Sequence, residues 1–241
     1  MESIPLNNSN IIYTCIIGKY DSLKTPTITT SGWDYVCYTD NTKLSSDFWN
    51  IKPIPSQYKE ITDPKRISSL LKIEHYNAVE EDYDTVIYVD GCIKVSVDLN
   101  KFLEFHNFAD YDLGIPNHLS RNCLYEEAKI CKGLGLDKDL LIDQQVQRYR
   151  DAGYPAHNGL WVSTGMVKNN KSNALKRVCE IWAEEYKMGC KRDQVSLNYA
   201  VWKASNLGHT IRVKNTVWGP SPVNMAFDFG MKGAFSTHSH L

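Results

Sequence analysis

The chain has 241 residues, of which 42% are apolar and 23% charged, and its formal net charge is −1. This length and composition allow a sizeable core and exclude wholesale disorder. Its 27 basic and 28 acidic residues create no overall positive field for a nucleic acid backbone, so recognition of phosphate groups has to be local. Basic residues do not cluster with aromatic ones, and nucleic acid is therefore not an expected partner.

The seven cysteines indicate a reducing environment. Their spacing contains no CxxC motif, and an odd count argues against a complete disulfide framework. The first ten residues lack the basic and apolar regions of a signal peptide, and the apolar runs are far shorter than the ~20 residues of a membrane-spanning helix. We therefore expect a cytoplasmic protein without a membrane span.

Hydrophobic runs and helix signals define the elements of the first half. In chain order these are a buried strand over 11–17 that ends at Gly18, a strand over 35–39 followed by Asp40, a helix that opens at Asp63-Pro64 and continues to Val79, a strand over 85–89 that ends at Asp90-Gly91, a helix near 98–108, and a short strand over 112–116.

The second half is more helical. Its predicted elements are helices near 121–131 and 138–151, a strand over 160–162 that turns at 163–165, a helix from Leu175 to Gly189 with Trp182 and Tyr186 in the core, a helix from Arg192 to Ser205, and a closing strand over 210–213.

This alternation of strands and helices predicts an α/β fold, with a mostly parallel central sheet flanked by helices. We expect one domain over residues 1–241, with 1–10 flexible and 218–241 irregular. In such sheets ligands bind at the carboxyl ends of the strands. The residues directly after the strands, above all Asp90, are therefore the first candidates for a site.

Asp90 follows an apolar strand and precedes Gly91. A carboxylate at the rim of a sheet, beside backbone that a ligand can approach, suits a hard divalent cation that bridges two phosphates. The same pattern also fits an ordinary turn in which Asp90 caps a backbone N–H group. Spacing alone leaves both interpretations open.

The segment Ile87–Cys92 resembles the DxD region of GT-A glycosyltransferases. More widely, the order of motifs is similar to the glycosyltransferase-like family catalogued as domain of unknown function 616. The motifs that carry this resemblance are 13–21, 35–41, Lys72-Ile73 with His75, the Asp90 strand, His118 with Arg121 and 125–128, and 192–196.

The resemblance implies a single GT-A-like (Rossmann-like) domain and a hexosyl- or deoxyhexosyl-transferase. Such an enzyme moves a sugar from a nucleoside-diphosphate sugar to a hydroxyl of a glycan or glycoconjugate. Two alternatives stay open: a nucleotidyltransferase that makes nucleotide sugars, and a non-catalytic domain that binds carbohydrate or nucleotide.

Cys92 stands where the second Asp of the DxD motif would be. A neutral thiol is a poor ligand for Mg²⁺ and only a fair one for Mn²⁺, so the resemblance supports nucleotide-sugar binding more than metal dependence. Asp90 either ligates Mn²⁺ or Mg²⁺, with help from a late histidine such as His238 or His240, or hydrogen-bonds the ribose. A frayed polar tail is the favoured explanation of the two histidines.

The resemblance also places residues around the nucleotide. Thr14 and Gly18 would offer backbone groups, Tyr20 would stack on the base or simply pack beneath its loop, and Asp40 would accept a hydrogen bond from the base or ribose. Gly91 and Cys92 would lie along the donor beside Asp90.

A diphosphate leaving group needs positive charge, because negative charge builds on it as the glycosidic bond breaks. The candidates are Lys72, Arg66 and Arg121, and His118 could bind the phosphates or the sugar. A helix lysine such as Lys72 is otherwise most often a solvated surface residue.

Asp193 and Gln194 would lie under the donor sugar. Asp193 would contact its hydroxyls, or act as the base that an inverting enzyme needs, although a helix start favours Asp in any case. Asn158, with Trp161 or Tyr154, would contact the acceptor.

Overall fold

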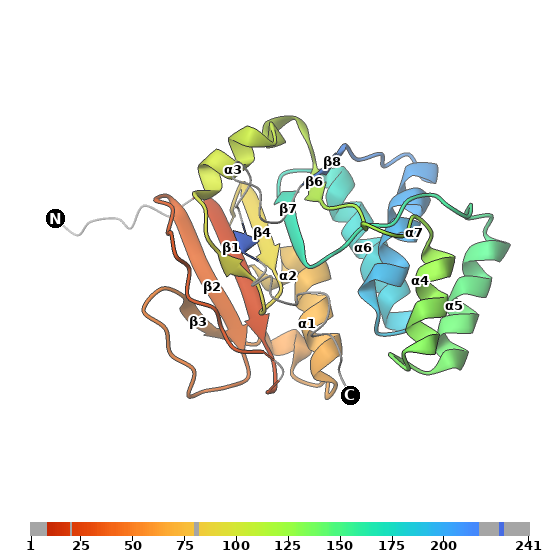
Figure 1. The fold of residues 1–241 in the computed structure, drawn as a ribbon, viewed down its shortest axis with the longest axis horizontal. Helices are drawn as coiled ribbons and strands as arrows, with labels where there is room; N and C mark the ends of the chain where they lie inside the picture. Colours follow the sequence, from red (N-terminus) through yellow and green to blue (C-terminus); the bar gives the residue numbers. More distant parts are fainter. Residues whose placement is uncertain (1–8, 20, 80–81, 217–226, 229–241) are drawn as a thin grey trace.

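The computed structural model describes residues 9–19, 21–79, 82–216 and 227–228, which form strands and helices in alternation (Figure 1). The strands are β1 (Asn10–Ile16), β2 (Trp33–Thr39), β3 (Asn50–Pro53), β4 (Thr85–Val89), β5 (Lys94–Val95), β6 (Leu113–Ile115), β7 (Gly165–Asn169), β8 (Val213–Asn215) and β9 (Phe227–Asp228). The helices are α1 (Pro64–Ile73), α2 (His75–Ala78), α3 (Leu99–Phe105), α4 (Leu124–Gly133), α5 (Asp139–Asp151), α6 (Asn173–Met188) and α7 (Asp193–Asn206), with short 3₁₀ turns at Ser56–Tyr58 and Phe108–Asp110.

The described residues form a central sheet of seven strands in the order β3-β2-β1-β4-β7-β6-β8. Strand β1 runs parallel to β2 and β4, and β8 runs parallel to β6. Only β7 is antiparallel to both of its neighbours, β4 and β6. The predicted α/β fold with a mostly parallel sheet is confirmed.

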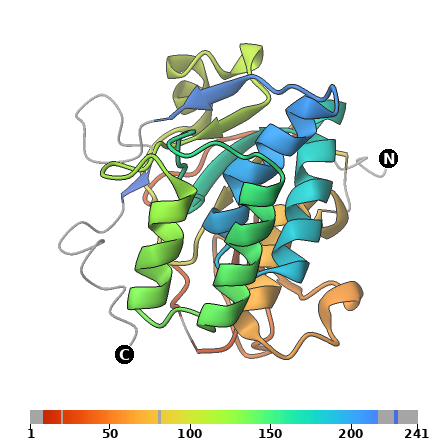
Figure 2. The same ribbon diagram turned by 90° about the vertical axis from the view of Figure 1, so that its right-hand side faces the viewer.

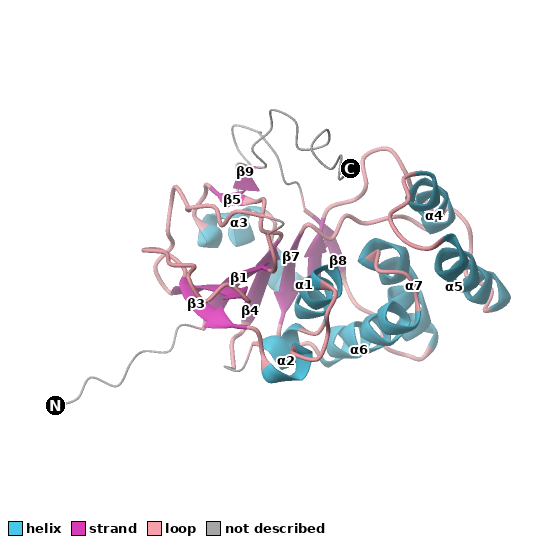
Figure 3. Ribbon diagram, turned by 90° about the horizontal axis from the view of Figure 1, so that it is seen from below, coloured by secondary structure: helices cyan, strands magenta, loops and turns pink. Residues whose placement is uncertain are grey.

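Helices cover both faces of this sheet (Figure 3), which explains why β1 is apolar on both sides. Tyr13 and Cys15 face the cluster formed with α1, α6 and α7, whereas Ile12 and Ile16 face the cluster that includes α3. Helices α4 and α5 lie beside α7 (Figure 2) and form a third cluster with it. The strands β1, β2 and β4 are therefore buried on both faces, whereas the outer strands β3 and β8 are partly exposed.

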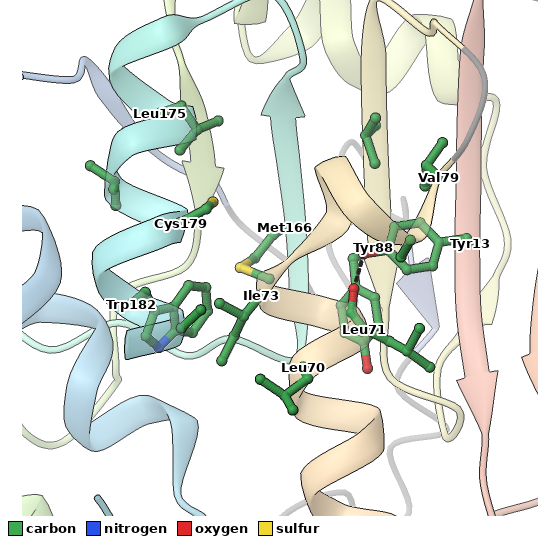
Figure 4. Packing of buried hydrophobic residues seen from close by; sticks show 14 of the residues in the cluster. Tyr13, Leu70, Leu71, Ile73, Val79, Tyr88, Met166, Leu175, Cys179 and Trp182 are labelled. Carbon is green, nitrogen blue, oxygen red and sulfur yellow. Dashed lines mark hydrogen bonds between the residues drawn. The ribbon is translucent and has the colours of Figure 1, made fainter. Parts of the chain in front are cut away.

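The larger core joins α1 and α6 to the sheet (Figure 4). The hydroxyl of Tyr13 donates to the carbonyl of Leu71 at 2.8 Å, which fixes α1 against β1. Trp182 and Tyr186 are buried in this core, as predicted. Helix α1 is thus held along its length, and its side chains have defined positions at the sheet edge.

Two predictions about the middle of the chain are wrong. The strand predicted over 160–162 makes a single bridge between Trp161 and Asn117. The strand of the sheet is β7, which begins at Gly165, where the sequence predicts a turn. The helix predicted to reach Val79 ends at Ile73 and is followed by the separate turn α2.

The ends of the chain also differ from the prediction. Asn10 already belongs to β1, the closing strand lies at 213–215 rather than 210–213, and Phe227–Asp228 pair with β5. Residues 1–8, 217–226 and 229–241 lie outside the described part of the chain.

A buried lysine explains the break after α1. A continuing helix would use the carbonyl of Lys72 to accept from the N–H of Tyr76, but this carbonyl accepts from Lys168 Nζ at 2.6 Å. Lys168 lies on β7, is 1% exposed, and its Nζ is also 3.1 Å from His75 Nδ1. Burial, reinforced by the charge of Lys72, lowers the pKa of Lys168 to about 8.

The lowered pKa of Lys168 predicts how the free energy of unfolding depends on pH. Below pH 8 Lys168 is charged in both the folded and unfolded states, and its burial penalty is constant. Between pH 8 and the ordinary lysine pKa of about 10.4, the unfolded state binds more protons, so the contribution of Lys168 to stability increases with pH. Urea unfolding at pH 7.5 and 9.5 measures this.

The unfolding free energy of the wild type minus that of Lys168→Met should increase by about 1–2 kcal/mol between these two pH values. The subtraction removes the titration of tyrosines and cysteines that both proteins share. A difference that stays constant or decreases with pH contradicts a buried lysine of lowered pKa.

Candidate functional site

The candidate site lies where the end of β4 meets α1 and the start of α7. Asp63 caps α1 by accepting from the N–H groups of Lys65 and Arg66, with Pro64 at the first helical position. This cap sets the start of the helix, and Lys72 follows in its last turn. Asp193 is the first residue of α7.

Lys72 lies between two carboxylates. Its ammonium nitrogen is 2.8 Å from Asp193 Oδ2 and 3.1 Å from Asp90 Oδ1. The side chain of Lys72 is 3% exposed and that of Asp193 6%, whereas that of Asp90 is 26% exposed. This buried cation therefore contacts a carboxylate 121 positions away in the sequence, and Asp90 is more accessible than either Lys72 or Asp193.

Hydrogen bonds from uncharged side chains complete the cluster. Tyr88 Oη donates to Asp90 Oδ1 at 2.7 Å, because the two residues are two apart along the chain and share a side of the strand. Ser163 Oγ donates to Asp193 Oδ2 at 2.9 Å. The indole N–H of Trp182 donates to the backbone carbonyl of Asp193 at 3.0 Å, so the start of α7 is fixed to α6.

Electrostatics keep both buried partners ionised. Burial by itself would lower the pKa of Lys72, but the charges of Asp193 and Asp90 and the hydrogen bonds to them raise it above its ordinary value. Burial by itself would raise the pKa of Asp193, but Lys72, Lys65 and Arg192 hold it far below its ordinary range. Asp193 is therefore a carboxylate at any physiological pH.

Gly91 is required by packing at the strand end. A Cβ atom there would lie 2.5 Å from Ile16 Cδ1 and 3.1 Å from Asp21 Cβ. The space above Gly91, predicted to admit a ligand, is thus occupied by side chains from β1 and the loop that follows it.

The described residues do not fit the divalent cation that the sequence motif implies. Asp90 Oδ1 already accepts from Lys72 and Tyr88. Burial, with the charges of Asp90 and Asp21, raises the pKa of the Cys92 thiol to about 11, so this thiol is protonated and a weak ligand. The described part of the chain contains no group of three His, Cys, Asp or Glu residues suited to a metal; His238 and His240 lie outside it.

The predicted nucleoside residues are partly engaged with one another. The N–H of Gly18, which has φ +68°, donates to both carboxylate oxygens of Asp40 at 2.9 and 3.0 Å. Thr14 is buried within β1, where it pairs with Cys37 of β2, so direct contact with a nucleoside is not available to it. Tyr20 lies outside the described residues.

Two of the predicted phosphate-binding cations have partners elsewhere. Arg66 donates to the carbonyls of Tyr186 and Gly189, at 3.3 and 3.1 Å, and closes the end of α6. Arg121 donates to Glu127 Oε2 at 2.8 Å. The structure does bring His118 and Arg121 together, with Nε2 of the histidine 2.8 Å from the guanidinium.

The predicted acceptor residues lie along the chain that enters β7. Gln194 Nε2 donates to the carbonyl of Trp161 at 2.8 Å, so α7 fixes this segment. Asn158 is exposed, whereas Tyr154 is buried in the α4–α5 cluster and belongs to the wall of a hollow of about 490 Å³. At 4% exposure Tyr154 offers little surface to a sugar.

Sequence reasoning missed three members of the cluster. Tyr88 was assigned only to a strand and Ser163 only to a turn, and Lys65 was not singled out. The two-residue spacing of Tyr88 and Asp90 was a usable signal for the first. Ser163 reaches Asp193 across 30 residues, and no local pattern indicates that contact.

Open α/β sheets typically bind their ligands at the carboxyl ends of the strands, which is where Asp90 lies. Residues 57–216, well over half of the chain, match the family described as the TOD1/MUCI70 glycosyltransferase-like domain. The protein belongs to this family. No curated protein matches the chain.

The solved structures that resemble the chain include three glycosyltransferases, each at 10% sequence identity. They are the apo form of mouse xyloside xylosyltransferase 1 (TM-score 0.46, covering 84% of this chain and 83% of that one), the mannosyltransferase Ktr4p from S. cerevisiae (0.41, 82% and 67%) and the apo structure of the bifunctional glycosyltransferase WbbM (0.49, 87% and 39%).

Removal of the central cation should destabilise the fold. Lys72→Met leaves two carboxylates facing each other, one of them buried, and should lower the unfolding free energy by about 3–5 kcal/mol. Urea unfolding measures this, with Arg177→Met as control, since the exposed pair of Arg177 and Glu180 should contribute less than about 1 kcal/mol. Adding Asp193→Asn to Lys72→Met should recover part of the loss. Equal effects for Lys72→Met and Arg177→Met would rule out a central role for Lys72.

If the site binds a nucleoside diphosphate, this binding should depend little on divalent cations. An ion at Asp90 would lie close to the Lys72 ammonium and be repelled by it. We expect the thermal stabilisation by UDP or GDP to change by less than about threefold in apparent affinity between EDTA and Mn²⁺. A larger gain with Mn²⁺ would show that residues beyond the described part, such as His238, complete a metal site.

Proposed function

We propose that the protein is a glycosyltransferase that moves a sugar from a nucleoside-diphosphate sugar to a hydroxyl of a glycan or glycoconjugate. Membership of a glycosyltransferase-like family supports the reaction class. The observation that carries the proposal is the cluster of Asp90, Lys72 and Asp193 at the carboxyl end of β4, the edge at which such sheets bind nucleotides.

In this proposal Asp90 is the residue that touches the donor. It is more exposed than Lys72 and Asp193, and Lys72 and Tyr88 both hold its Oδ1 atom. The carboxylate is thus fixed in orientation, and its second oxygen can accept a hydrogen bond from a ribose or sugar hydroxyl. Fixed polar groups bind a transition state without reorganising.

Asp193 acts as a positioning residue rather than a base. A general base works best with a pKa near the working pH, whereas the pKa of Asp193 lies far below its ordinary range. Its Oδ2 atom accepts from both Lys72 and Ser163. Asp193 therefore keeps Lys72 charged and in place, and through Lys72 it orients Asp90.

The hollow beside α4 and α5 is the proposed site for the acceptor. It is open and polar, and its lining includes Glu126, Lys129, Arg150 and His157, which can hydrogen-bond the hydroxyls of a glycan. His157 is fixed by a contact of 2.8 Å between its Nδ1 and Asn122 Oδ1. The loop over 153–157 lies a few residues before the Trp161 segment that Gln194 binds, which links the hollow to the start of α7.

A donor screen tests the proposal. UDP-, GDP- and dTDP-sugars should be compared by thermal shift and by release of the nucleoside diphosphate, and at least one should both stabilise the protein and be hydrolysed slowly or transferred. For that donor, Asp90→Asn should reduce turnover by about 10²-fold or more, because a fixed charge at the donor is lost. The control Asp47→Asn changes an exposed loop carboxylate and should leave turnover unchanged.

Release of pyrophosphate from a nucleoside triphosphate would instead identify a nucleotidyltransferase. Nucleotide binding without turnover of any donor would identify a binding domain. Either result would disprove the proposed reaction.

A further inference from the structure

A lysine that the sequence motifs did not indicate lies at the mouth of the cluster. Lys65 is in the first turn of α1, seven residues before Lys72, and this spacing of nearly two turns places both on one side of the helix. Lys65 Nζ is 4.0 Å from Asp193 Oδ1, on the opposite carboxylate oxygen from the one that Lys72 contacts.

Lys65 and Lys72 have the same charge but different surroundings. Lys72 is 3% exposed and makes contacts of 2.8 and 3.1 Å with two carboxylates, so its ammonium has little capacity for a further anion. Lys65 is 35% exposed, and its contact with Asp193 is longer than a hydrogen bond. Asp90, Lys72 and Asp193 together carry one negative charge, which holds the Lys65 ammonium near the cluster without a hydrogen bond. Lys65 can therefore turn to an incoming anion without breaking a short contact.

Lys65 lies near the end of β1 as well as near the cluster. The β1 end approaches the same turn of α1, since a Cβ atom on Gly18 would lie 3.6 Å from Pro64 Cγ. The charge of Lys65 also acts on Cys15 in β1 and on Asp193 in α7. Lys65 therefore lies between the segment proposed to hold the nucleoside and the cluster proposed to face the sugar.

We propose that Lys65 binds the diphosphate group of the donor and stabilises the charge that develops on it as the glycosidic bond breaks. The inference rests on the proposed function and goes further by assigning the diphosphate to Lys65 in place of Lys72 and Arg66. A flexible ammonium suits this task, because it follows the phosphate oxygens as the bond to the sugar lengthens.

Calorimetry with inorganic pyrophosphate and with UDP tests the assignment on the full chain. Lys65→Gln should weaken the binding of pyrophosphate by about tenfold or more, as expected for loss of one charge-assisted contact, and Lys65→Arg should restore most of it. Lys191→Gln is the matched control: Lys191 is 36% exposed and lies 3.6 Å from Asp63, so it resembles Lys65 in exposure and pairing but does not contact the cluster. It should bind pyrophosphate within about threefold of the wild type.

Melting temperatures of all variants should be close to that of the wild type, since among the described residues the Lys65 ammonium has only the long contact of 4.0 Å with Asp193 to lose. Unchanged pyrophosphate affinity in Lys65→Gln, an equal loss in Lys191→Gln, or no pyrophosphate binding by the wild type would overturn the assignment. If pyrophosphate binding depends on Lys65 but no sugar nucleotide is turned over, the assignment stands and the transferase reaction fails.

Discussion

The structure depends on one ammonium group held between two carboxylates. Asp193 is buried at the start of a helix and remains ionised, and a buried charge is tolerated only beside an opposite one. Lys72 supplies that charge and contacts Asp90 at the same time. The positions of α1, β4 and α7 are therefore coupled. A shift of any one of them would pull Lys72 away from a carboxylate and leave a buried charge without its partner.

This arrangement performs within the chain the task that a bound cation performs in other carboxylate sites. A metal must be acquired from solution, and its affinity depends on pH because its ligands have to lose protons. Lys72 is a buried residue of the chain itself, so this positive charge does not have to be bound from solution. Tyr88 and Ser163 donate further hydrogen bonds to the two carboxylates. The described site is thus ordered before any ligand arrives, which reduces the reorganisation that binding requires.

The sequence predicted the sheet better than the site. Strands β1, β2 and β4 were found within one or two residues because they are continuous apolar runs buried on both faces. The sequence did not predict strand β7, because this strand begins at a glycine and contains Lys168. Lysine is usually exposed, whereas Lys168 is buried. Asp90 and Asp193 were both identified, but their connection through Lys72 depends on chain segments that only folding brings together.

The seven-residue interval between Lys65 and Lys72 limits how this chain can diverge. Loops around α1 can change in length at modest entropic cost, but one residue inserted within the interval would rotate the later lysine by about 100° around the helix axis. Only one of the two could then reach Asp193. Related sequences that retain this site should therefore vary in length outside the interval and keep it free of insertions and deletions.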